Sequence, residues 1–100
     1  MAVGVLLNLP GVTQEQYEQV NEKLFGQYPM PADKAPDGCV MHSAGPSEDG
    51  WYVYDIWESP EHFQRFGEEQ VGPAMAEVLG GGGPPPQPQF FPIHNFVIAA

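Results

Sequence analysis

The stretch from Trp51 to Trp57, WYVYDIW, constrains the fold of this chain more than any other segment. Aromatic and β-branched residues dominate it, which predicts a strand. Alternate strand residues point to opposite faces, and here both faces are apolar. Trp51, Val53 and Trp57 share one face, and the other face carries Tyr52, Tyr54 and Ile56. A strand of this kind needs cover on both sides, so the rest of the chain has to supply it.

A strand and a helix are predicted before this segment. Residues 2–9 alternate as a strand with apolar residues on both faces, and Pro10-Gly11 ends it. Thr13 and Gln16 match the capping box that opens a helix. Apolar residues at helical spacing follow, and Gly26 and Pro29 mark the end of this helix.

The remaining elements complete an alternating order. Residues 39–44 predict a short strand, joined to residues 51–57 by a turn over residues 45–50. Ser59 followed by Pro60 starts a second helix, in which Gly72-Pro73 predicts a break or kink. Residues 80–88 are rich in Gly and Pro and predict a linker, and residues 90–98 predict the last strand.

The order β-α-β-β-α-β is that of the ferredoxin-like α+β fold, and we expect one such domain over residues 1–100. In this fold the first and third strands lie in the middle of a four-stranded antiparallel sheet, and both helices cover one face. The other apolar face then has no cover within the chain. A second copy of the chain would supply that cover, so we expect a homodimer joined through or near its sheets.

Composition excludes several classes of partner. The formal net charge is −10 and the chain has only three basic residues, too few to neutralise a nucleic acid or an anionic membrane. A single cysteine, Cys39, allows no internal disulfide. The apolar run at the N-terminus is too short for a signal sequence or a membrane span. We therefore expect a cytoplasmic protein that binds neither nucleic acid nor membrane.

The element order and the segment WYVYDIWESPEHF, residues 51–63, resemble the dimeric α/β-barrel superfamily and most of all its antibiotic-biosynthesis-monooxygenase-like branch. In that branch a strand ending in a Trp-Glu-Ser segment runs into the second helix. The resemblance covers essentially the whole chain and implies a homodimer. The superfamily includes cofactor-independent oxygenases, heme-degrading enzymes, cyclases and isomerases, so the fold does not fix the activity.

Polar residues on apolar strands are the candidates for chemistry, and Asp55 is the most anomalous of them. A carboxylate there is either an acid/base or ligand anchor, or a structural carboxylate bonded to a Tyr, a His or Arg65. Asp55 and His94 are the candidate catalytic residues. His42 and His94 are expected on opposite edge strands and cannot meet within one subunit. The candidate substrate-binding residues are Asn8, His42, Tyr54, Trp57 and Phe66.

Three functions remain open from the sequence. The first is a cofactor-independent monooxygenase acting on an aromatic or polycyclic small molecule, as the resemblance implies. The second is a non-catalytic binding or accessory protein. The third, a heme-degrading enzyme, is disfavoured because only Asn8 matches, while Phe66 and Ala76 stand where such enzymes carry a Trp and a His. No paired His or Cys spacing typical of a metal site is present, and we expect no cofactor.

Overall fold

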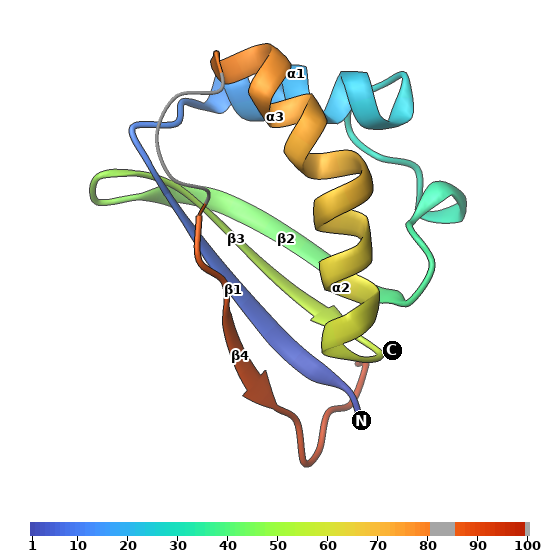
Figure 1. Ribbon diagram of the computed structural model, residues 1–100. Coiled ribbons are helices and arrows are strands. Elements are labelled where there is room, and N and C mark those ends of the chain that lie inside the picture. Colours follow the sequence, from blue (N-terminus) through green and yellow to red (C-terminus); the bar gives the residue numbers. More distant parts are fainter. Residues whose placement is uncertain (81–85, 100) are drawn as a thin grey trace.

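Four strands form one antiparallel sheet in the order β2-β3-β1-β4. This arrangement is seen in a computed structural model, which describes residues 1–80 and 86–99 (Figure 1). The central strands are β1 (Val3–Pro10) and β3 (Gly50–Trp57), and the edges are β2 (Cys39–Ser47) and β4 (Gln89–Pro92). The order confirms the ferredoxin-like fold, with the two most apolar strands in the middle.

The first helix, α1 (Gln14–Phe25), begins at the capping box that the sequence predicts. The Thr13 hydroxyl accepts a bond from the Gln16 amide at 3.1 Å, and the Gln16 side chain accepts one from the Thr13 amide at 3.0 Å. Gly26 ends the helix in the left-handed conformation, with φ of 77°. A short 3₁₀ turn, η1 (Ala32–Lys34), lies in the loop that follows.

The second helix is continuous where the sequence predicts a break or kink, and it carries a local widening there. It consists of α2 (Pro60–Phe66), a π-helical turn η2 (Gly67–Val71) and α3 (Gly72–Leu79). In the wide turn the Gly72 amide donates to the Gly67 carbonyl, five residues back. Pro73 then falls at the start of α3, where a missing amide hydrogen costs little. The widened turn therefore absorbs the proline without ending the helix.

The hairpin turn and the last strand also differ from the prediction. The strands β2 and β3 pair as far as Ser47 and Gly50, so the turn holds only Glu48 and Asp49. The last strand ends at Pro92 instead of residue 98, because Pro92 already pairs with Val3, the first residue of β1. Most of the linker predicted at residues 80–88 lies outside the described residues.

In the described part of the chain, the helices all cover one face of the sheet and leave the opposite face bare (Figure 1). The core between sheet and helices is built around Val3, Val5 and Trp57, with Phe63, Phe66 and Phe90 packed against it. The strand pairings place a second apolar set on the bare face: Leu6, Met41, Tyr52, Tyr54, Ile56 and Phe91. The sheet is therefore apolar on both faces, as the sequence predicts, but covered on one.

Candidate functional site

An apolar cavity of about 110 Å³ lies between the sheet and the helices; we call it the inner cavity. Aliphatic and aromatic side chains from both layers form most of its wall, among them Leu7, Leu9, Val20, Leu24, Phe25, Val53, Trp57, Phe63, Phe66 and Met75. Few polar side chains reach it, and they are Tyr17, Asn21, Cys39, His42 and Asp55. A mostly apolar wall with a few convergent polar groups is typical of a small-molecule site.

Four of the wall residues form one hydrogen-bonded chain, the Tyr17–His42–Asp55–Trp57 chain. The Tyr17 hydroxyl bonds to Nε2 of His42. Nδ1 of His42 lies 2.7 Å from Oδ1 of Asp55. Nε1 of Trp57 donates to the other carboxylate oxygen, Oδ2, at 3.1 Å. The carboxylate of Asp55 thus has a donor on each oxygen.

The strand register brings these groups together. The tight turn at Glu48 and Asp49 sets the pairing of β2 with β3, and this pairing places His42 directly opposite Asp55. Trp57 lies two residues further along β3 and so faces the same side.

Tyr17 reaches the two strands from α1, one turn after the N-cap. Its ring packs against the rings of Trp51, at a centroid distance of 5.5 Å, and Tyr28, at 6.1 Å. These contacts hold the phenol over β2, where it meets His42.

Burial governs the protonation of two groups in this wall. It raises the pKa of the Tyr17 phenol to about 12 and that of the Cys39 thiol to about 11. Tyr17 is therefore a neutral hydrogen-bond donor at neutral pH, and Cys39 stays a thiol, which is a poor nucleophile. Asp55 is only 5% exposed, whereas the His42 side chain is 26% exposed. His42 thus connects the buried carboxylate with the solvent.

The hydrogen-bond pattern assigns the roles within the chain. Asp55 accepts from Nδ1 of His42, which leaves Nε2 as the acceptor for the Tyr17 hydroxyl. A proton taken from a group beside Tyr17 can pass through its hydroxyl to Nε2. The carboxylate of Asp55 stabilises the imidazolium that then forms. This arrangement is suited to general-base chemistry on an acidic hydroxyl or carbon.

The structure brings together only part of the residue set predicted from the sequence. Asp55, His42, Trp57 and Phe66 all line the inner cavity. Asp55 is bonded to a His and a Trp, which satisfies the structural interpretation of this carboxylate and is equally compatible with a catalytic one.

Three predicted residues lie elsewhere. Asn8 and Tyr54 alternate onto the bare sheet face and do not line the inner cavity, because they are displaced by one residue from Leu7, Leu9, Val53 and Asp55 on the covered face. His94 lies beyond β4, exposed to solvent. Its expected place on the last strand is wrong because that strand ends at Pro92.

Tyr17 is the wall residue that the sequence did not connect with His42 and Asp55. Its role depends on meeting His42, 25 positions away in the chain. The sequence feature that could have indicated this role is the position of Tyr17 near the start of the helix. A Tyr on the buried side there can direct its hydroxyl at the sheet.

No group of three or more His, Cys, Asp or Glu side chains positioned to hold a metal ion is found among the described residues. Within the same part of the chain, no helix is long and apolar enough to cross a membrane.

Comparison with known proteins bears on the fold of this chain. No model of a known protein family matches the chain, and no curated protein sequence matches it. Among solved structures, the chain is similar to a monooxygenase from the gene ActVA-Orf6 of Streptomyces coelicolor, determined in complex with the ligand nanaomycin D. The TM-score is 0.55 at 19% sequence identity, over 99% of this chain and 92% of the other. This likeness confirms the ferredoxin-like fold that the sequence predicts.

Proposed function

We propose that this protein is a cofactor-independent monooxygenase-like enzyme that acts on a small aromatic molecule bearing an acidic hydroxyl. The observation that carries the proposal is the Tyr17–His42–Asp55–Trp57 chain in the wall of an apolar cavity. The fold shared with a monooxygenase supports it. An aromatic substrate that reduces oxygen itself needs a base, an apolar pocket and the exclusion of water. In this proposal His42 is the base, and the apolar wall of the cavity supplies the pocket.

Each residue of the chain has a separate role in this proposal. Tyr17 contacts the substrate hydroxyl and passes its proton on, and His42 is the general base that receives it at Nε2. Asp55 fixes the tautomer of His42 and stabilises the imidazolium. Trp57 fixes the second carboxylate oxygen. The rings of Phe63 and Phe66 pack on Trp57 at centroid distances of 5.6 and 5.7 Å and form the wall against which a planar substrate lies.

The reaction balances with molecular oxygen as the only co-reactant. Loss of a proton to His42 gives an electron-rich carbanion or phenolate, which reduces oxygen and forms a carbon–oxygen bond to it. Protonation gives a hydroperoxide at a CH carbon. Loss of water from this hydroperoxide breaks the oxygen–oxygen bond and leaves a carbonyl. In total, a CH₂ group and O₂ become C=O and H₂O.

The size of the cavity limits the substrate. An engineered cavity of roughly 150 Å³ holds one benzene ring, so the inner cavity, at about 110 Å³, admits one ring only after its wall adjusts. Met30 and Met75 are the flexible wall residues that can move with least cost. Substrates of two or three rings therefore place their further rings at the mouth of the cavity.

Oxygen consumption tests the proposal. The purified protein, free of flavin and metal, is given a panel of hydroxylated naphthalenes and anthrones, and oxygen uptake and incorporation of isotopically labelled oxygen are measured. We expect turnover of at least one compound. His42→Ala should then lower kcat by about 10²- to 10⁴-fold, the usual contribution of a general base. His94→Ala is the matched control and should retain activity, and equal losses in both variants would remove His42 from the mechanism.

A second candidate function has its own observation. The polar groups of the chain are already satisfied by one another, and the cavity is small, as in a protein that binds a ligand without transforming it. Thermal-shift screening with the same panel separates the two functions. Compounds that raise the melting temperature but consume no oxygen favour a binding or accessory protein.

The protein is also proposed to act as a homodimer. Six large apolar side chains lie on the bare sheet face. Two of these six, Tyr52 and Tyr54, lie flat against the sheet. A Cβ added to Gly4 would lie 2.5 Å from the Tyr54 hydroxyl, and one added to Gly45 would lie 3.1 Å from the Tyr52 ring. Rings that lie along the sheet make a flat apolar surface, suited to packing against the same surface of a second copy.

A further inference from the structure

A charged groove lies between the loop after η1 and the outer side of α2. Its volume is about 350 Å³, and its charged and titratable wall residues are Lys34, Asp37, His62, Arg65 and Glu69. The whole chain has only three basic residues, and two of them, Lys34 and Arg65, line this one groove.

The charged groove adjoins the inner cavity. Four apolar residues line both hollows, and they are Leu24, Phe25, Pro36 and Phe66. The rings of Phe25 and Phe66 stack there at a centroid distance of 6.4 Å. A ligand whose ring enters between these side chains therefore has its outer end beside the charged residues.

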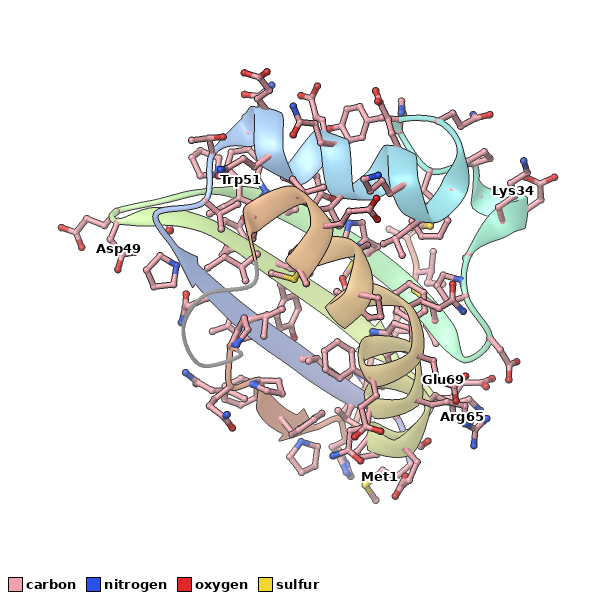
Figure 2. The ribbon with its side chains drawn as sticks, turned by 45° about the horizontal axis from the view of Figure 1, so that its top comes forward. Met1, Lys34, Asp49, Trp51, Arg65 and Glu69 are labelled. Carbon is pink, nitrogen blue, oxygen red and sulfur yellow. The ribbon has the colours of Figure 1, made fainter. Side chains whose placement is uncertain are left out.

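The two cations of the groove are available to a ligand. Within the described part of the chain, neither Lys34 nor Arg65 forms an ion pair. The remaining basic residue, Lys23, pairs with Glu77 at 2.9 Å and lies outside the groove. Asp37 lies 3.8 Å from Nε2 of His62. Glu69 is four residues after Arg65 on the helix, and the two side chains point away from the sheet at the same corner of the molecule (Figure 2).

We propose that the charged groove binds the carboxylate of the aromatic ligand whose ring occupies the inner cavity. The inference rests on the proposed function and narrows the ligand to an aromatic hydroxy acid. Arg65 presents a planar guanidinium, which matches a carboxylate with two parallel hydrogen bonds.

The charge of the groove selects a singly charged group. Lys34 and Arg65 balance Asp37 and Glu69, so the groove is close to neutral within a strongly acidic surface. One carboxylate can displace Glu69 from the vicinity of Arg65. A doubly charged phosphate would meet the two carboxylates at close range and the field of the whole acidic chain as well, which disfavours it.

Isothermal titration calorimetry with a matched pair of probes tests this inference. 6-Hydroxy-2-naphthoate and 6-hydroxy-2-naphthamide share the phenol and the ring system and differ in charge at the other end. We expect the naphthoate to bind about fivefold more tightly, the scale of a solvent-accessible ionic hydrogen bond. Arg65→Gln should abolish this preference, and Glu69→Gln should increase it. Both variants should still bind the amide, with a smaller change in affinity than for the naphthoate, which also shows that they fold.

Lys23→Gln is the matched control, because it removes the same charge from outside the groove. It should keep the preference for the naphthoate. Equal affinity of the wild type for the two probes would overturn the carboxylate site and leave the proposed function intact. Failure of both probes to bind would overturn the inference together with the inner cavity as a site for aromatic ligands. Loss of the preference in Lys23→Gln as large as in Arg65→Gln would reduce the effect to net charge and overturn the site.

Discussion

Asp55 places a carboxylate in an apolar core, at 5% exposure, and the cost of burying it is offset by two donors. An ionised group in such a place is tolerated only when its oxygens are hydrogen-bonded. The donors come from His42 on the neighbouring strand and from Trp57 on the same strand. The carboxylate therefore stabilises the β2–β3 pairing and orients His42 at the same time.

Replacing Asp55 by Asn tests this dual role. Asn has one oxygen and one NH₂ group, whereas Asp55 offers two accepting oxygens. Either His42 or Trp57 would therefore face a donor in place of an acceptor. We expect the free energy of unfolding to fall by about 1–3 kcal/mol, the cost of an unsatisfied buried polar group. Urea denaturation of Asp55→Asn beside Asp33→Asn, an exposed carboxylate in η1, measures it. A loss no greater than that of Asp33→Asn would contradict the prediction.

The Tyr17 phenol predicts how stability depends on alkaline pH. Burial raises its pKa from 10.0 to about 12 in the folded protein, so the folded state holds the proton longer than the unfolded state. The stabilisation is complete below pH 10 and is lost as the pH rises towards 12. The buried thiol of Cys39 adds a similar loss at slightly lower pH.

Tyr17→Phe should therefore reduce the fall of the unfolding free energy between pH 10 and 11. Urea midpoints at pH 9, 10 and 11 measure it, with Tyr28→Phe as the control that removes a phenol exposed by 42%. An unchanged slope in Tyr17→Phe would show that the phenol is not held neutral by burial.

At the scale of elements, the π-helical turn η2 joins α2 and α3 into one helix. Gly67 and Gly72 bound this turn, and both have helical φ angles, near −60° and −55°. A Cβ on Gly67 would meet nothing within 4 Å, whereas one on Gly72 would lie 3.2 Å from the Gly67 carbonyl oxygen. The two glycines thus have the same backbone conformation and differ in the room available for an added methyl group.

Alanine substitutions at these glycines should separate the two effects. Gly67→Ala should stabilise the protein by about 0.5–1 kcal/mol, because alanine loses less backbone entropy in a helix. Gly72→Ala should gain less, since its methyl group crowds the carbonyl that defines the wide turn. Thermal denaturation of the two variants gives the order, and a larger gain at position 72 would contradict the geometry.

The bare sheet face is a property of the whole molecule. Ferredoxin-like order leaves one face of the sheet without helices. Aromatic and aliphatic side chains lie on that face, most of them half-buried and Phe91 exposed. The net charge of −10 opposes association of two copies, and salt screens that repulsion. Dimerisation through this face should therefore strengthen with ionic strength.

Sedimentation equilibrium tests the dimer and its surface. Tyr52→Glu, on the bare face, should shift the wild-type dimer towards monomer, because it buries an unpaired charge in the interface. Gln19→Glu adds the same charge on the exposed side of α1 and should remain dimeric. A monomeric wild type at micromolar concentration, or equal behaviour of the two variants, would argue against an interface on this face.

The sequence by itself determined the kinds of elements, their order, the central place of β1 and β3 and the apolar character of both sheet faces. These are local properties, because capping residues and the alternation of apolar side chains act within a few positions of the chain. It also singled out Asp55 as the residue in need of an explanation.

Only the tertiary structure decided which residues meet Asp55. The predicted turn over residues 45–50 would have paired Ala44 with Trp51 and set His42 opposite Val53. The observed turn holds two residues and sets His42 opposite Asp55, and the placement of α1 then brings Tyr17 to His42. Register and helix placement depend on contacts between residues far apart in the chain. Single segments of the sequence therefore predict the elements of the fold but do not predict the candidate site.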